Sequence, residues 1–189
     1  QQFLDYFLDF IENQFLPKCE EEGIDTILHL GDLMDRRKFV NFNTLNQVRE
    51  RFIEKLQERG TKMYCIIGNH DTYYKNTNKV NAINELCTTY DGIKEPWIYD
   101  KAVTKNFGGT DICLIPWICD DNYEHSINEI ETSKAQIALG HLEIKGFEMH
   151  SGHMNMQGLD KSMFHRFEKV LSGHFHKKSD DGHIYYLGT

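Results

Sequence analysis

Apolar positions near the start of the chain recur at helical spacing, and most of them are aromatic. The set comprises Phe3, Phe7, Phe10, Ile11 and Phe15. This spacing predicts a helix over residues 3–16 whose aromatic face packs on a core. A second helical pattern begins at Thr44, with Gln47 placed for a capping box, and ends at Gly60. Residues 80–90 are predicted to form a further helix.

Short apolar runs of the kind that form buried strands alternate with these helices and dominate the second half of the chain. They lie at residues 25–30, 62–67, 111–115, 135–139, 169–172 and 183–187. In the first half of the chain helices alternate with strands, and in the second half strands dominate. This order indicates an α/β layered domain with two sheets and helices outside. The length suits one domain over residues 1–189.

Composition narrows the class of protein. Lys and Arg total 21 and Asp and Glu total 29, so the formal charge is −8. Proteins that hold nucleic acid by surface charge alone are normally basic, so here a bound cation or a partner would have to supply the attraction. Five cysteines without a Cys-x-x-Cys pair favour a reducing compartment over a disulfide scaffold. No apolar run reaches about 18 residues, so no membrane span is expected, and early acidic residues argue against a signal peptide.

Metal-capable side chains follow four of the predicted strands, each directly after a glycine. The four strand ends read Gly31-Asp32, Gly68-Asn69-His70-Asp71, Gly140-His141 and Gly173-His174-Phe175-His176. Ligands of α/β sheets collect at the carboxyl ends of strands, so we expect these side chains to share one pocket. The expected metal ligands are Asp32, Asn69, His141, His174 and His176.

This ligand set mixes carboxylate, amide and imidazole groups without thiolate, which suits manganese, iron or zinc better than calcium. One carboxylate can bridge two ions that activate water for in-line attack on a phosphate ester. His70 is placed to protonate the leaving oxygen, and Asp71 to hold the His70 ring in one tautomer. A single Gly-Asp or Gly-His would more often be an ordinary turn; the string at 68–71 makes the metal interpretation specific.

Three further groups of residues lie near these motifs. Candidate contacts to a phosphate backbone or a base follow the first two strand ends, with a solvated loop as an equally weighted alternative. They are Arg36, Arg37, Lys38, Tyr73, Tyr74 and Lys75. A loop near the pocket is favoured over a second metal site for the cluster of His150, His153, Met154 and Met156. His29, inside a strand, is interpreted as structural.

In this order, the four glycine motifs resemble those of the calcineurin-like metallophosphoesterases over residues 20–189. The stretch from Gly31 to Lys38 and the string Ile115-Pro116-Trp117 resemble, more narrowly, the nuclease subunits of SbcCD-type repair complexes, in particular the recombination endonuclease subunits of T-even-like phages. The resemblance implies a four-layer α/β/β/α sandwich. It also implies two divalent metal ions, manganese above all, with magnesium, iron or zinc as alternatives.

The resemblance carries residue roles and partners as well. Asp32 would bridge the two ions, Asn69, His141 and His174 would complete one of them, and His176 would bind the other. His70 would stabilise the transition state or leaving group, with Asp71 behind it. The implied activity is endo- and exonucleolytic cleavage of DNA ends in the cytoplasm, the host's if the protein is phage-encoded. The implied partners are an SbcC-type ATPase and a second copy, with the helices near 44–59 and 79–90 as the dimer face.

The chain departs from the family pattern at both ends. Family members open with a strand carrying Asp-x-His, and no Asp-x-His precedes Asp32; they also continue beyond the position of Thr189 into a capping region. We therefore expect a fragment that lacks the first strand, binds one ion well and the other poorly, and cleaves slowly or not at all. A phosphoesterase acting on small molecules or proteins, and a non-catalytic DNA-end-binding scaffold, remain open as alternatives.

Overall fold

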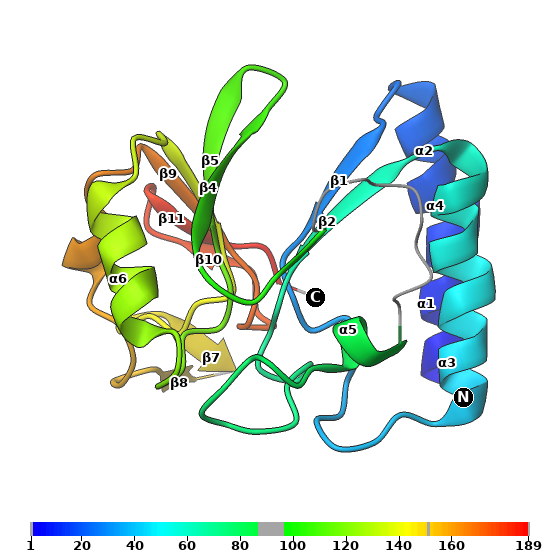
Figure 1. Cartoon of the computed structure of the whole chain (residues 1–189), viewed down its shortest axis with the longest axis horizontal. Coiled ribbons are helices and arrows are strands. Elements are labelled where there is room, and N and C mark those ends of the chain that lie inside the picture. Colours follow the sequence, from blue (N-terminus) through cyan, green and yellow to red (C-terminus); the bar gives the residue numbers. More distant parts are fainter. Residues whose placement is uncertain (1, 87–96, 151, 189) are drawn as a thin grey trace.

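A computed structural model describes residues 2–86, 97–150 and 152–188 of the chain (Figure 1). Helices, a three-stranded sheet, a six-stranded sheet and further helices follow one another as four layers. This arrangement confirms the expected α/β/β/α sandwich. Among the described residues, no helix has both the length and the apolar character needed to cross a bilayer.

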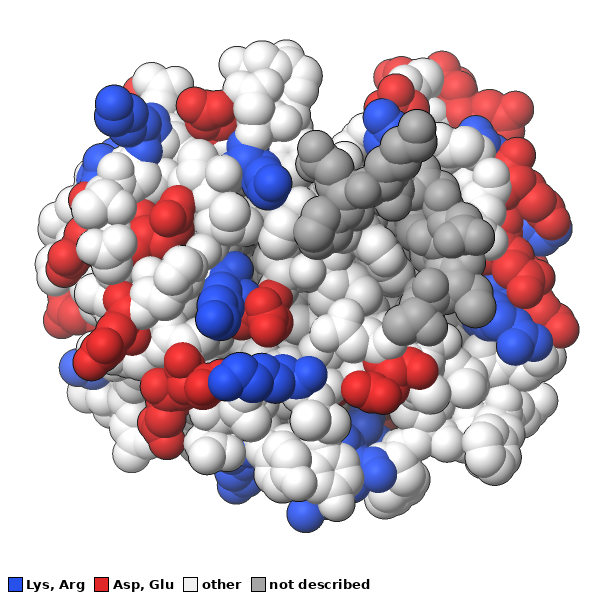
Figure 2. Space-filling model, viewed as in Figure 1, with Lys and Arg blue, Asp and Glu red and all other residues white. Residues whose placement is uncertain are grey.

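The first layer consists of two long helices, each with a π-helical segment in its middle. Their parts are α1 (Gln2–Phe10), η1 (Ile11–Phe15), α2 (Leu16–Glu21), α3 (Phe42–Val48), η2 (Arg49–Ile53) and α4 (Glu54–Arg59). The Arg51 guanidinium joins the helices: its Nε and Nη2 donate to both oxygens of Glu12 at 3.0 and 2.6 Å, and Nη2 to Asp9 at 2.7 Å. Figure 2 shows acidic side chains gathered over this layer, whose residues 2–22 and 42–59 contain nine acidic and five basic residues.

The first helix is present as predicted, with Ile11 buried and Phe15 packed against the core, but the rest of its aromatic face is not buried. Phe3 is 82% exposed and Phe7 and Phe10 are also exposed, whereas Leu8, a residue outside the predicted set, is fully buried. The other buried residues of this helix are Ile11, Leu16 and Cys19. The helix carries an aliphatic stripe beside the aromatic one, and packing on the first sheet selects the aliphatic stripe. Helical periodicity alone does not distinguish between them.

The second long helix begins earlier than predicted. Asn41 caps it, because its Oδ1 accepts hydrogen bonds from the backbone amides of Asn43 at 2.9 Å and Thr44 at 3.4 Å. The capping box at Thr44 is therefore wrong. The predicted end is confirmed by Gly60, which has a φ of +67°. Helix α5 (Ala82–Leu86) lies within the predicted 80–90 segment, and residues 87–90 lie outside the described part of the chain.

Both sheets are mainly parallel. The first has the order β1-β2-β3, and the second has the order β10-β11-β9-β6-β5-β4 with antiparallel strands at both edges. The first sheet contains β1 (Thr26–His29), β2 (Lys62–Ile66) and β3 (Ile98–Tyr99). The second contains β4 (Val103–Phe107), β5 (Thr110–Ile115), β6 (Ile137–Gly140), β9 (Lys169–Ser172), β10 (Ser179–Asp180) and β11 (Ile184–Tyr186). All six predicted strands are present, although β6 begins two residues later than predicted.

Elements that the sequence did not predict complete the second half. Helix α6 (Tyr123–Thr132) and the short η3 (Lys161–Phe164) belong to the fourth layer, and β7 (Glu148–His150) pairs with β8 (His153–Met154) as a separate hairpin. Figure 1 places this hairpin at the lower edge of the second sheet. Part of the cluster expected to form a loop is therefore β-structure.

Two buried asparagines tie the ends of the two sheets together. The Asn78 Nδ2 donates to the carbonyls of Trp117 at 2.7 Å and Asp100 at 3.2 Å, and the Asn122 Nδ2 donates to the same two carbonyls. Asp100 directly follows β3, and Trp117 lies just after β5. The hydrogen bonds therefore fix the carboxyl end of β3, in the first sheet, next to that of β5, in the second sheet.

Candidate metal centre

The loops that follow β1, β2, β6 and β9 meet at one place between the sheets. Gly31, with a φ of +86°, lies so close to the next loops that an added Cβ would be 2.7 Å from the Gly68 nitrogen and 2.8 Å from Nδ1 of His141. No side chain fits in that space, which explains why glycine is needed at the first strand end. The contact brings the loops after β1, β2 and β6 together.

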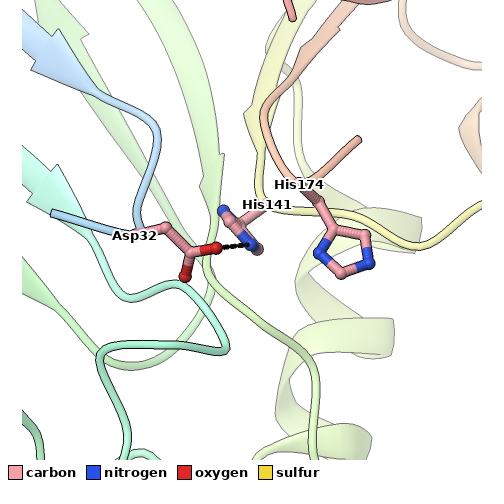
Figure 3. A group of neighbouring side chains, drawn as sticks. All are labelled: Asp32, His141 and His174. Carbon is pink, nitrogen blue, oxygen red and sulfur yellow. Dashed lines mark ion pairs between the residues drawn. The ribbon is translucent and has the colours of Figure 1, made fainter. Parts of the chain in front are cut away.

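Four of the five predicted ligands converge there. Asp32, His141 and His174 each offer a ligand atom, and these atoms all lie within 4.8 Å of one another (Figure 3). The Asn69 Oδ1 lies 2.9 Å from Nε2 of His141 and 2.9 Å from Nδ1 of His174. Asp32 comes from the first sheet and the two histidines come from the second, so the site depends on the packing of both sheets.

The protonation of these groups suits a cation. Nδ1 of His141 lies 2.8 Å from the Leu30 carbonyl, which can only accept a hydrogen bond, so Nδ1 carries a hydrogen and the ring turns Nε2 toward Oδ2 of Asp32 at 3.3 Å. Burial would raise the pKa of Asp32, but the hydrogen bond and charge of His141 hold it below its usual value. Burial lowers the pKa of His174 to about 4, which keeps that ring neutral. Electron-pair donors that face one another in this way fit a divalent ion.

Two of the predicted ligands have unusual backbone conformations. Among the described residues, Asp32 with a φ of +55° and His174 with a φ of +81° are the non-glycine residues in the left-handed region. Such conformations cost roughly 1–3 kcal/mol and persist where the surroundings impose them, commonly at functional sites. Their coincidence with the converging ligands supports the assignment of this site.

Asp71 makes contacts that the sequence did not suggest. It is fully buried, and its Oδ2 accepts hydrogen bonds from the backbone amides of Gly68 and Asp32, both at 2.8 Å, while its Oδ1 accepts from Met34 at 3.1 Å. Burial raises the pKa of Asp71 to about 6. The carboxyl therefore holds the loop that carries Asp32, through backbone amides rather than through the His70 ring.

The ring of His70 has a backbone partner instead. Its Nδ1 lies 2.6 Å from the Asp35 carbonyl, so Nδ1 carries a hydrogen and Nε2 is left for other work. The backbone amide of His70 donates to Oδ1 of Asp32 at 2.7 Å. The tautomer expected for a proton-transfer residue is thus set by Asp35 rather than by Asp71.

A cavity of about 270 Å³ opens beside the converging ligands. It is lined by Asp32, His70, Met149, His174, Phe175 and His176. His176, the fifth predicted ligand, faces this cavity but is not part of the tight group around Asp32. Met149 was not predicted, although its neighbours in sequence had been singled out as a cluster near the pocket.

Trp117 packs beside the histidines. Its ring centroid lies 5.2 Å from that of His174 and 6.4 Å from that of His141. This residue belongs to the Ile115-Pro116-Trp117 string, to which the sequence pattern assigned no function. The indole makes the site visible to fluorescence measurements.

The family model for calcineurin-like phosphoesterases matches residues 2–178. The chain belongs to this family. The phosphoesterase is also 36% identical over 176 residues to a protein of Enterobacteria phage T4 named exonuclease subunit 1, an alignment that covers 93% of this chain. The chain spans 50% of the length of that relative. The expected resemblance to a T-even phage nuclease subunit is thereby confirmed.

Distant likenesses to this phosphoesterase occur among solved structures. A hypothetical protein from Thermus thermophilus has a TM-score of 0.47 and 14% identity, covering 96% of this chain and 69% of its own. GAP50, described as the anchor in the inner membrane complex of Plasmodium, has a TM-score of 0.46 and 14% identity, covering 98% of this chain and 65% of its own.

Basic and aromatic side chains form a rim next to His70 in the phosphoesterase. The Arg36 guanidinium lies 5.5 Å from the centre of the Phe39 ring, and the Lys38 ammonium lies 5.6 Å from that of Tyr73. Arg37 donates to the Thr72 hydroxyl at 3.4 Å. Other predicted contacts lie in the second loop, where Tyr74 packs edge-on against Tyr73 and Lys75 is exposed. The structure thus brings the loops 36–39 and 72–75 together at the edge of the site.

The pH dependence of stability offers a test of the buried state of His29. Burial, followed by the charge of His141, lowers the pKa of His29 to about 4, and its Nδ1 accepts a hydrogen bond from the Gly31 amide at 3.2 Å. Between pH 6.5 and 4 the unfolded chain binds a proton that the folded chain does not bind. As the pH is lowered from 6.5 to 4, the His29 contribution should therefore reduce the free energy of unfolding of the metal-free protein by roughly 1–3 kcal/mol.

The variant His29→Asn keeps an acceptor near the position of Nδ1 and removes the titration. In urea unfolding with EDTA, lowering the pH from 7.5 to 4 should reduce the free energy of unfolding less, or raise it more, in this variant than in the wild type. The comparison is needed because Asp71, with a pKa raised to about 6, acts in the opposite direction in both proteins. Equal slopes would mean that His29 is protonated in the folded state.

Proposed function

We propose that this phosphoesterase hydrolyses phosphodiester bonds in DNA, as one nuclease domain of a larger protein, with two divalent ions of which manganese is the first candidate. The supporting observation is the convergence of electron-pair donors from both sheets beside a cavity that His70 also lines. Asp32, Asn69, His141 and His174 would hold one ion. His176, with Asp32, would hold the other with fewer protein ligands.

The chain's own residues have distinct tasks in this proposal. Ions held at the site would lower the pKa of a bound water and neutralise charge on the phosphate. His70, with Nδ1 fixed on the Asp35 carbonyl, takes up a proton on Nε2 and gives it to the leaving oxygen. Asp71 keeps the Asp32 loop in place through the backbone amides.

The rim and the phage relative support a proposal for the substrate and the partners. Arg36, Arg37, Tyr74 and Lys75 would contact the phosphate backbone or stack on bases of a DNA end, because cations and aromatic rings bind these two parts of a strand. The relative is named a subunit, which supports assembly with a second component. We propose an SbcC-type ATPase for that role, and a homodimer formed through α3, α4 and the α5 region.

Cleavage of two substrates tests the proposal. The chain is incubated with a labelled hairpin oligonucleotide and with bis(p-nitrophenyl) phosphate, in manganese and in EDTA, and His141→Ala serves as the variant with a broken site. We expect slow cleavage of both substrates that needs manganese and is absent in the variant. Hydrolysis of the small ester without binding of DNA would favour a small-molecule phosphoesterase. Tight DNA binding without hydrolysis of either substrate would favour a scaffold.

A further inference from the structure

An exposed methionine forms an apolar wall of the cavity at the metal centre. Met149, the middle residue of β7, lines that cavity together with His70 and the histidines of the last strand end, and 36% of it is exposed. The other apolar lining residue, Phe175, is only 3% exposed. Apart from these two, the lining residues are titratable, so Met149 is the apolar group that a bound molecule would meet.

The β7–β8 hairpin is attached firmly to the site. Glu148 forms an ion pair with Lys177, the residue directly after His176, and also accepts a hydrogen bond from the Gly152 amide at 2.7 Å. At the base of the hairpin, the Phe147 ring is buried against Tyr186, with centroids 4.9 Å apart. These contacts, made by the two residues that precede Met149, hold β7 beside the cavity.

The chemistry of this wall matches one part of a nucleic-acid strand. A phosphodiester in DNA carries its charge on the phosphate, and a sugar with a flat base lies on either side. The metal ligands that line the cavity account for the phosphate, and Met149 is the exposed apolar group of that lining that a sugar or base would meet. A thioether is flexible and polarisable, packs on the face or edge of any aromatic ring, and needs no hydrogen bond. Contact of this kind is tolerant of sequence.

We propose that Met149 is a specificity-determining residue, which contacts the sugar or base of the nucleotide next to the bound phosphate. The hairpin thereby favours a nucleic-acid strand over a compact phosphate ester. This inference rests on the proposed function and assigns a substrate contact within it. It also gives a role to the part of the chain in which the sequence showed only a cluster of histidines and methionines.

Oxidation of methionine tests the contact without any turnover. The chain is treated with dilute hydrogen peroxide in manganese, with and without a phosphorothioate single-stranded oligonucleotide that resists cleavage, and oxidation at each methionine is followed by mass spectrometry. Bound oligonucleotide should slow oxidation of Met149 about three- to tenfold. Oxidation of Met156, which is 79% exposed and lines a different hollow, should not change.

Matched variants supply a second measurement. Met149→Ala should weaken binding of the same oligonucleotide about three- to tenfold by fluorescence anisotropy, Met149→Leu should restore most of it, and Met156→Ala should have no effect. Manganese affinity, measured by calorimetry, should be the same in all four proteins. Binding of the wild type with Met149 unprotected, or an equal loss of manganese affinity in Met149→Ala, would overturn this inference alone. Failure of the wild type to bind the oligonucleotide at all would overturn the proposed function as well.

Discussion

Replacement of His70 by alanine is expected to lower kcat for phosphodiester hydrolysis by roughly 10²- to 10⁴-fold, the usual share of a positioned proton donor. The ring is exposed on the cavity side, and its contact with the Asp35 carbonyl fixes the hydrogen on Nδ1. Because the His70 backbone amide, and not its ring, holds Asp32, the substitution leaves that hydrogen bond in place. Steady-state kinetics with bis(p-nitrophenyl) phosphate in manganese measures the effect.

Metal binding separates this role from that of a ligand. Calorimetric titration of His70→Ala with manganese should give the wild-type affinity, and His165→Ala, an exposed histidine outside the cavity lining, should retain full activity. A loss of manganese affinity that parallels the loss of kcat would show that His70 belongs to the metal-binding set. A change in KM alone would assign it to substrate binding.

Replacement of Asp71 by alanine is expected to destabilise the protein by about 3–5 kcal/mol, because it leaves buried backbone amides without an acceptor. The amides of Gly68 and Asp32 lose a partner at 2.8 Å, and that of Met34 loses one at 3.1 Å. Since the Asp32 backbone is held in a left-handed conformation, its release should also weaken manganese binding by about 10- to 100-fold. Urea unfolding and calorimetry measure the two effects.

Two other carboxyl variants show whether the effect is specific to this position. Asp71→Asn keeps one carbonyl oxygen, so its free energy of unfolding and its manganese affinity should both lie between those of the wild type and of Asp71→Ala. Asp160→Ala removes an exposed carboxylate that caps η3 through the Ser162 amide at 2.9 Å, and should cost about 1 kcal/mol with no change in manganese affinity. If Asp71→Ala instead lowered kcat while stability and metal affinity stayed the same, the carboxyl would act through the His70 ring.

Local patterns account for the parts of the site that lie within one strand end. The type of each ligand could be predicted from the residues that follow the glycines at the strand ends, because a sharp turn after a strand places the next side chain at the edge of the sheet. The left-handed Gly60 and the six strands are likewise local, since backbone preference and apolar runs act within a few residues. The expected pocket followed from the rule that parallel strands bring their carboxyl ends together.

The amino-acid sequence by itself determined the ligand types, the strand ends and the family motifs of this protein. Only the tertiary structure decided which stripe of α1 is buried, that Asp71 binds backbone amides of the Asp32 loop, and that Met149 faces the metal centre. The physical reason is that these outcomes depend on contacts between residues distant in the chain. Which contact forms depends on the difference in energy between alternative partners, such as the aliphatic and the aromatic stripe of α1 packed on the same sheet. The sequence pattern does not contain that energy difference.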